Sequence, residues 1–93
     1  MKNKLQYIID TYGTSSQVDM AIEECSELQK ALLKHRRKPG EEAREAIIDE
    51  IADVEIMLNQ LKLIFSCTKD VSERVDYKIE RQLERIKARW RNG

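Results

Sequence analysis

Two pairs of acidic residues stand at helical spacing in the first two thirds of the chain. Glu24 and Glu27 form one pair, and Glu50 and Asp53 form the other. Residues three positions apart occupy neighbouring sites on one helix face, so each pair would present both of its carboxylates together. Carboxylate oxygens are the ligands that Mg²⁺ and Mn²⁺ prefer. The spacing therefore indicates a site for a hard divalent cation where the two pairs meet.

The surroundings of these acids are apolar. Successive helical residues turn by about 100°, which places Glu24 roughly 40° from Leu28 and inside an apolar arc. Glu50 falls between Val54 and Met57 in the same way. A carboxylate in such surroundings takes up a proton or acquires a cation. The alternative is that all four acids lie on solvated faces and pair with Lys or Arg, which is a common role at this spacing.

A basic stripe follows near the end of the chain. The expected apolar seam of this segment consists of Val71, Val75, Ile79, Leu83, Ile86 and Trp90. Beside it stand Arg74, Lys78, Arg81, Arg85 and Arg89. Arg holds phosphate oxygens in bidentate geometry, and Lys acts as a point charge. The stripe suits a polyphosphate when a Mg²⁺ site is near; otherwise it is a solvated face paired with neighbouring Glu residues.

The segments that position these residues have a helical pattern throughout. Lys38-Pro39-Gly40 must interrupt any helix, because proline removes a donor and glycine leaves the backbone loose. Two further breaks lie near residues 13–16 and 66–70, where Ser16 and Asp70 are expected to cap the helices that follow. The pattern predicts four helices, over residues 2–12, 16–37, 41–65 and 70–91.

We expect residues 1–93 to form one all-α domain, a compact antiparallel helical bundle whose first helix is short. The third expected helix is apolar on nearly every side and must be covered all round. So short a chain has too few helices to cover it. The sequence therefore predicts that oligomerisation completes the bundle, as a homodimer or a homotetramer.

Composition narrows the classes of function. Seventeen Lys and Arg balance seventeen Asp and Glu, so no net field favours nucleic acid or an anionic membrane. Cys25 and Cys67 are too few for a disulfide framework or a zinc site, and we expect Cys25 to be buried. No segment has the apolar length of a signal peptide or a membrane span, so a cytoplasmic setting is expected.

The two acidic motifs resemble those of the all-α nucleotide pyrophosphatase superfamily, which includes MazG proteins, dimeric dUTPases and phosphoribosyl-ATP pyrophosphatases. Its members carry E-E-x-x-E on one helix and E-x-x-D on the next. Here the motifs are Glu23-Glu24-Cys25-Ser26-Glu27 and Glu50-Ile51-Ala52-Asp53, with 22 residues between them. The resemblance covers roughly residues 16–89 and is greatest to small phage- and prophage-type MazG-like proteins.

The resemblance implies that Glu24, Glu27, Glu50 and Asp53 ligate Mg²⁺, with Mn²⁺ as a substitute. Glu24 or Glu27 would also orient or deprotonate the attacking water. No residue resembles an activated nucleophile, so no covalent intermediate is expected.

The resemblance also implies substrate contacts. Lys78, with Arg81 or Arg85, would match the downstream basic residues that contact phosphates. Gln17 resembles a polar position that some relatives use near the substrate. Alternatively, Gln17 is a surface residue in the first turn of its helix.

The implied activity is hydrolysis of a nucleoside triphosphate between the α and β phosphates, which releases a monophosphate and pyrophosphate. A phosphoribosyl-ATP pyrophosphatase-like enzyme is an alternative, because it uses a similar short chain. A non-catalytic helical oligomer that binds a protein partner is the alternative from another class. With one Phe and one Trp in the chain, no stacking pocket for a base is evident.

Overall fold

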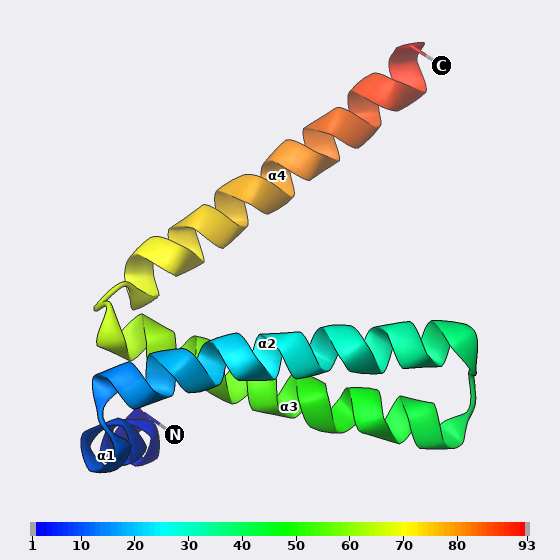
Figure 1. Ribbon diagram of the computed structural model, residues 1–93. Helices are drawn as coiled ribbons and strands as arrows, with labels where there is room; N and C mark the ends of the chain where they lie inside the picture. The colour runs from blue at the N-terminus through cyan, green and yellow to red at the C-terminus, as the bar shows by residue number, and fades with distance from the viewer. Residues whose placement is uncertain (1, 93) are drawn as a thin grey trace.

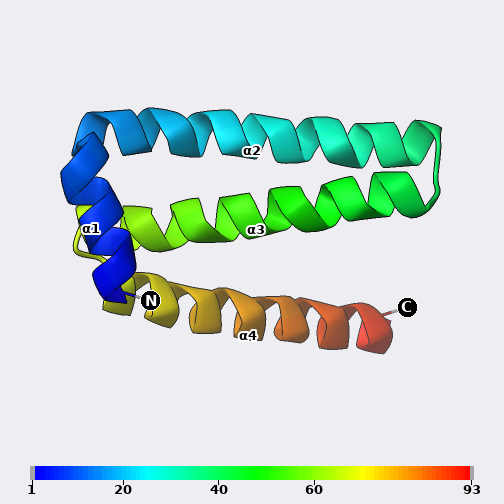
Figure 2. The same cartoon turned by 90° about the horizontal axis from the view of Figure 1, so that it is seen from below.

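The computed structural model describes residues 2–92, which form four α-helices. These are α1 (Lys2–Tyr12), α2 (Thr14–Arg37), α3 (Glu41–Ile64) and α4 (Thr68–Asn92). α2 and α3 lie side by side as an antiparallel hairpin, and α1 crosses the open end of this hairpin (Figure 1, Figure 2). α4 starts at the same end and leads away from the hairpin (Figure 1). The prediction of an all-α chain is confirmed.

The breaks between helices fall where the sequence predicts them, but two of the predicted caps are wrong. α2 begins at Thr14, directly after Gly13, whose φ of 95° suits glycine. Ser16 therefore lies inside the first turn of α2 and does not cap it. α4 begins at Thr68, so Asp70 also lies inside a first turn, where its charge complements the helix dipole.

The turn from α3 to α4 is tight and hydrogen-bonded. The Ser66 N–H donates to the Leu63 carbonyl (3.2 Å), and the Cys67 N–H donates to the Lys62 carbonyl (2.9 Å). This pair of bonds is the Schellman motif, whose central residue adopts a left-handed conformation. Ser66 is that residue, with φ 50°. A serine therefore occupies a position that favours glycine.

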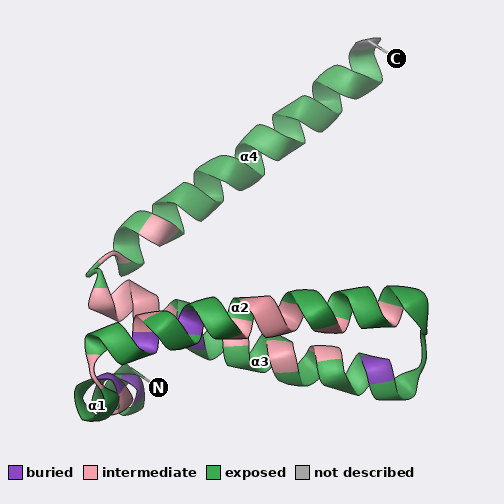
Figure 3. Ribbon diagram, viewed as in Figure 1, coloured by how far each residue is buried: buried purple, intermediate pink, exposed green. Residues whose placement is uncertain are grey.

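The core lies mainly where α1 meets the hairpin (Figure 3). Its buried apolar residues are Leu5, Ile9, Ala21, Ala43 and Met57. Gln17 and Gln60 are buried as well, and Gln60 is only 1% exposed. Within residues 2–92, neither the nitrogen nor the oxygen of the Gln60 amide has a hydrogen-bond partner. The small apolar core thus encloses an amide whose missing hydrogen bonds lower the free energy of unfolding.

A single chain covers little of its apolar surface. Its accessible surface is 7730 Å², whereas a compact monomer of this mass would expose about 5,600 Å². Its radius of gyration is 17.2 Å, against about 12 Å for a compact chain of this length. α4 approaches only α3 among the described helices. One chain therefore does not close a four-helix bundle by itself.

The expectation that α3 is covered all round does not hold within one chain. Its apolar residues Ile48, Ile51, Ile56 and Leu58 are all exposed.

In the described part of the chain, no helix has the length and apolar character needed to cross a lipid bilayer.

The Ser66 turn gives a prediction about stability. Replacement Ser66→Gly should raise the free energy of unfolding by about 0.5–1 kcal/mol, because glycine removes the cost of the left-handed conformation. The matched control Ser26→Gly, in the middle of α2, should lower it by about 0.5 kcal/mol. Urea unfolding followed by circular dichroism measures both changes. A destabilised Ser66→Gly protein would show that the turn does not limit stability.

Candidate metal centre

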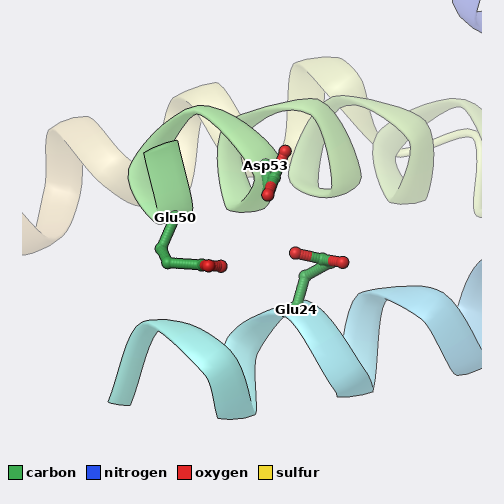
Figure 4. Close-up of side chains that lie close together, drawn as sticks. All are labelled: Glu24, Glu50 and Asp53. Atoms are coloured by element: carbon green, nitrogen blue, oxygen red, sulfur yellow. The ribbon is translucent and has the colours of Figure 1, made fainter. Parts of the chain in front are cut away.

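The hairpin brings three of the four predicted carboxylates together. One carboxylate oxygen of each of Glu24, Glu50 and Asp53 lies within 4.8 Å of the other two. Glu24 extends from α2 toward Glu50 and Asp53 on α3 (Figure 4). The break at residues 38–40 sets the antiparallel register that makes these acids face each other. We call these three residues the acidic cluster.

Glu27, the fourth predicted ligand, is not part of the acidic cluster. Its Oε1 lies 3.3 Å from Nζ of Lys30, one turn further along α2. This is the ion pair that the alternative interpretation of the acids expects. Glu27 is nevertheless close enough for its charge to raise the pKa of Glu50. It therefore lies at the edge of the cluster.

The cluster disfavours its own negative charge. Burial raises the pKa of Glu24 above its ordinary value of 4.5, and the charge of Asp53 and a hydrogen bond between the two carboxyl groups raise it further. The pKa of Glu50 is also raised, first by burial and then by the charges of Asp53 and Glu27. A bound cation would reverse both effects, because it favours the ionised carboxylates.

Glu50 supplies the clearest sign of a missing partner. Its Oε2 atom is buried and has no hydrogen-bond donor among the described residues. A buried acceptor without a donor is costly and requires an explanation such as an ion or an ordered water. The donor atoms of the cluster are all carboxylate oxygens, which fit Mg²⁺ or Mn²⁺. Asp53 is exposed, so the cluster is open to solvent on one side.

The basic residues predicted to contact phosphates lie elsewhere. Lys78, Arg81 and Arg85 are exposed on α4, which leads away from the hairpin (Figure 1, Figure 3). The Arg81 guanidinium carbon lies 5.8 Å from the centre of the Tyr77 ring, a cation–π contact within the helix. The structure therefore does not bring these cations to the acidic cluster of the same chain.

Two other predicted positions differ from expectation. Gln17 is buried, so its interpretation as a surface residue is wrong, and it does not belong to the acidic cluster. Cys25 is exposed, so its predicted burial is also wrong. Cys25 lies in an apolar hollow between α2 and Leu61 of α3, and no described residue covers it.

The burial of Gln60 was not predicted from the sequence. This amide stands inside the apolar stretch of α3 that runs from residue 56 to residue 65. A polar residue at such a position was the available signal, because a buried amide needs partners.

The raised pKa values predict how the metal-free protein responds to pH. A group whose pKa is higher in the folded than in the unfolded state stabilises the fold below its unfolded pKa, here about 4.5. That stability is lost as the pH rises through the folded pKa. In EDTA, Glu24→Gln should therefore lose less stability than the parent between pH 4.5 and pH 8. Glu42→Gln, an exposed change on α3, is the matched control, and thermal melts measure the difference. Identical pH profiles for all three proteins would contradict mutual repulsion in the cluster.

The sequence matches no protein-family model, and no curated protein or solved structure shows a significant match to it. Its resemblance to the all-α nucleotide pyrophosphatases rests on the two acidic motifs, their order and their spacing. The geometry of the acidic cluster is the independent observation beside that resemblance.

Proposed function

We propose that this chain is a Mg²⁺-dependent nucleoside triphosphate pyrophosphohydrolase of the MazG-like type. It would hydrolyse a ribo- or deoxyribonucleoside triphosphate between the α and β phosphates and release a monophosphate and pyrophosphate. The observation that supports this best is the convergence of Glu24, Glu50 and Asp53 from two helices, with one buried and unpartnered carboxylate oxygen. These are the positions that the two motifs assign to metal ligands.

The acidic cluster would hold the cation, and Glu27 stands beside it. When bound, a divalent cation neutralises phosphate oxygens and lowers the pKa of a coordinated water. Glu27 is half-exposed and paired with the exposed Lys30, so it suits the role of a base that orients the attacking water. Glu24 is the other candidate, although its raised pKa disfavours the anionic form in the absence of a cation.

The leaving pyrophosphate needs positive charge near the cluster. Lys30 lies at the edge of the cluster through its ion pair with Glu27 and is otherwise exposed. The phosphate contacts of Lys78, Arg81 and Arg85 remain a prediction, because they require an α4 helix to approach a hairpin. Charge neutralisation at a leaving group strengthens in the transition state and therefore lowers the barrier.

We expect the active form to be a homo-oligomer, a homodimer or a homotetramer. The large accessible surface of one chain and the exposed apolar residues of α3 and α4 support this expectation. Association would complete the helical bundle that one chain leaves open.

The activity predicts metal-dependent release of pyrophosphate from one or more members of a panel of NTPs, dNTPs and phosphoribosyl-ATP. Glu50→Gln and Asp53→Asn should each lower kcat/KM by about 100-fold or more, since even outer partners of metal ligands cost 10–100-fold. Glu42→Gln should retain the parent activity. Circular dichroism and Mg²⁺ titration accompany the assay. Absence of both turnover and metal binding in the folded parent would leave only a helical binding module.

A second assay separates the candidates for phosphate binding. If Lys30 contacts phosphate, Lys30→Ala should raise KM about tenfold, which corresponds to the loss of about 1.4 kcal/mol. Lys34→Ala, one turn further along the exposed side of α2, is the matched control. A larger effect of Arg81→Ala than of Lys30→Ala would instead favour the α4 residues.

A further inference from the structure

The apolar seam of α4 lies open to solvent. Every residue from Ser72 to Arg91 is exposed. Val75, Ile79, Leu83 and Ile86 are each between 45% and 52% exposed, and Trp90 is 81% exposed. From Val75 to Trp90 this seam extends about 22 Å along the helix. A continuous apolar row of this length marks an interaction surface.

The charges beside the seam are sorted by sign. With Ile79 at the centre and about 100° per residue, one side carries Arg74, Lys78, Arg85 and Arg89. The other side carries Glu73, Asp76, Glu80 and Glu84, with Lys69 before them and Lys87 and Arg91 after them. Lys69 pairs with Glu73, and Lys87 pairs with Glu84, within the helix. Between Glu73 and Arg85, α4 therefore has a basic flank and an acidic flank on opposite sides of one seam.

This pattern is complementary to itself in one orientation. When two identical helices pack seam to seam in parallel, the left flank of each meets the right flank of the other, as e and g positions do in parallel coiled coils. The basic flank of one α4 then faces the acidic flank of the other. In the antiparallel orientation, basic faces basic and acidic faces acidic, which is unfavourable.

Between Arg74 and Arg85, the parallel arrangement matches oppositely charged residues at nearly the same height, whereas Arg89 comes level with Lys87 and Arg91 of the second helix. Lys78 lies two residues, or about 3 Å along the axis, from the level of Glu80 in the second helix. Arg85 and Glu84 lie one residue apart in level, and so do Arg74 and Glu73. Arg81 and Tyr77, which contact each other, lie on the opposite side and stay outside the contact.

We infer that α4 of this chain pairs in parallel with α4 of a second copy, seam to seam and in register. The surface of one chain supports a second copy as the occupant. One chain exposes about 2,000 Å² more than a compact monomer of its mass. An obligate homodimer buries roughly 1,000–2,500 Å² on each partner. Lys78 and Arg85 then contact the acidic flank of the partner helix.

Cysteine cross-linking tests the orientation. In a Cys25→Ser/Cys67→Ser background, Val75→Cys and Ile86→Cys should each form a disulfide-linked dimer with itself under mild oxidation. The two positions lie about 16 Å apart along the helix, so a parallel pair joins both, whereas an antiparallel pair joins at most one. Tyr77→Cys and Ala88→Cys, on the far side of α4, are the controls that should stay monomeric on denaturing gels. Self-linking at one position only, or at neither, overturns the proposal.

Charge reversal tests the flanks. Lys78→Glu should weaken the dimer about tenfold or more in Kd, because two symmetric attractive contacts become repulsive. Adding Glu80→Lys to the same chain should restore the parent Kd. Ala88→Glu controls for added negative charge. Sedimentation over a concentration series, without nucleotide, measures the Kd apart from any activity.

The other outcomes of the sedimentation and cross-linking experiments also decide the question. A monomer at all concentrations overturns the proposal, and so does a Lys78→Glu defect that Glu80→Lys fails to repair. A dimer that cross-links Leu83→Cys only to Ile22→Cys, beside the hollow of α2, would show that the seam packs on the hairpin of the second copy instead.

Discussion

Repulsion between carboxylates in a partly desolvated space is the constraint on which the hairpin depends. Glu24, Glu50 and Asp53 must be held together by the packing of α2 on α3, since nothing among the described residues neutralises them. That packing is modest, with Ala21, Ala43 and Met57 as its buried apolar contacts. A cation that binds only the folded hairpin would add about 2.7 kcal/mol at a concentration one hundred times its Kd. Binding of such a cation would therefore be linked to folding of the hairpin.

The rest of the fold serves to keep the hairpin in register. α1 covers the open end, where Leu5 and Ile9 are buried. The glycine-containing break at residues 38–40 closes the other end. The cost of the unpartnered Gln60 amide falls close to α1, at the end of the hairpin away from that break. These missing hydrogen bonds offset part of the stability that Leu5, Ile9 and Met57 contribute at this end.

Helical periodicity and the Pro39-Gly40 break indicated that two acidic pairs could meet, and three of their four carboxylates do come together. The periodicity and the break place Glu24, Glu50 and Asp53 correctly because a short turn leaves an antiparallel hairpin little freedom of register. The spacing did not predict whether Glu27 would join the acidic cluster or pair with Lys30, which lies one turn away on the same helix. The direction of α4 depends on the backbone of residues 65–67, which periodicity does not describe. The exposure of Cys25 follows from that direction, because no helix of the same chain covers it.

The left-handed Ser66 turn has a mechanical consequence. α4 is about 37 Å long, and among residues 2–92 it contacts the other helices only beside its first turn. A change of about 10° in its direction, smaller than the scatter of roughly 15–20° in helix dihedrals, would displace its far end by about 6 Å. Small differences at one serine are thus amplified along a rigid rod. In a dimer joined through α4, the three connecting residues 65–67 would therefore govern the separation between the two acidic clusters.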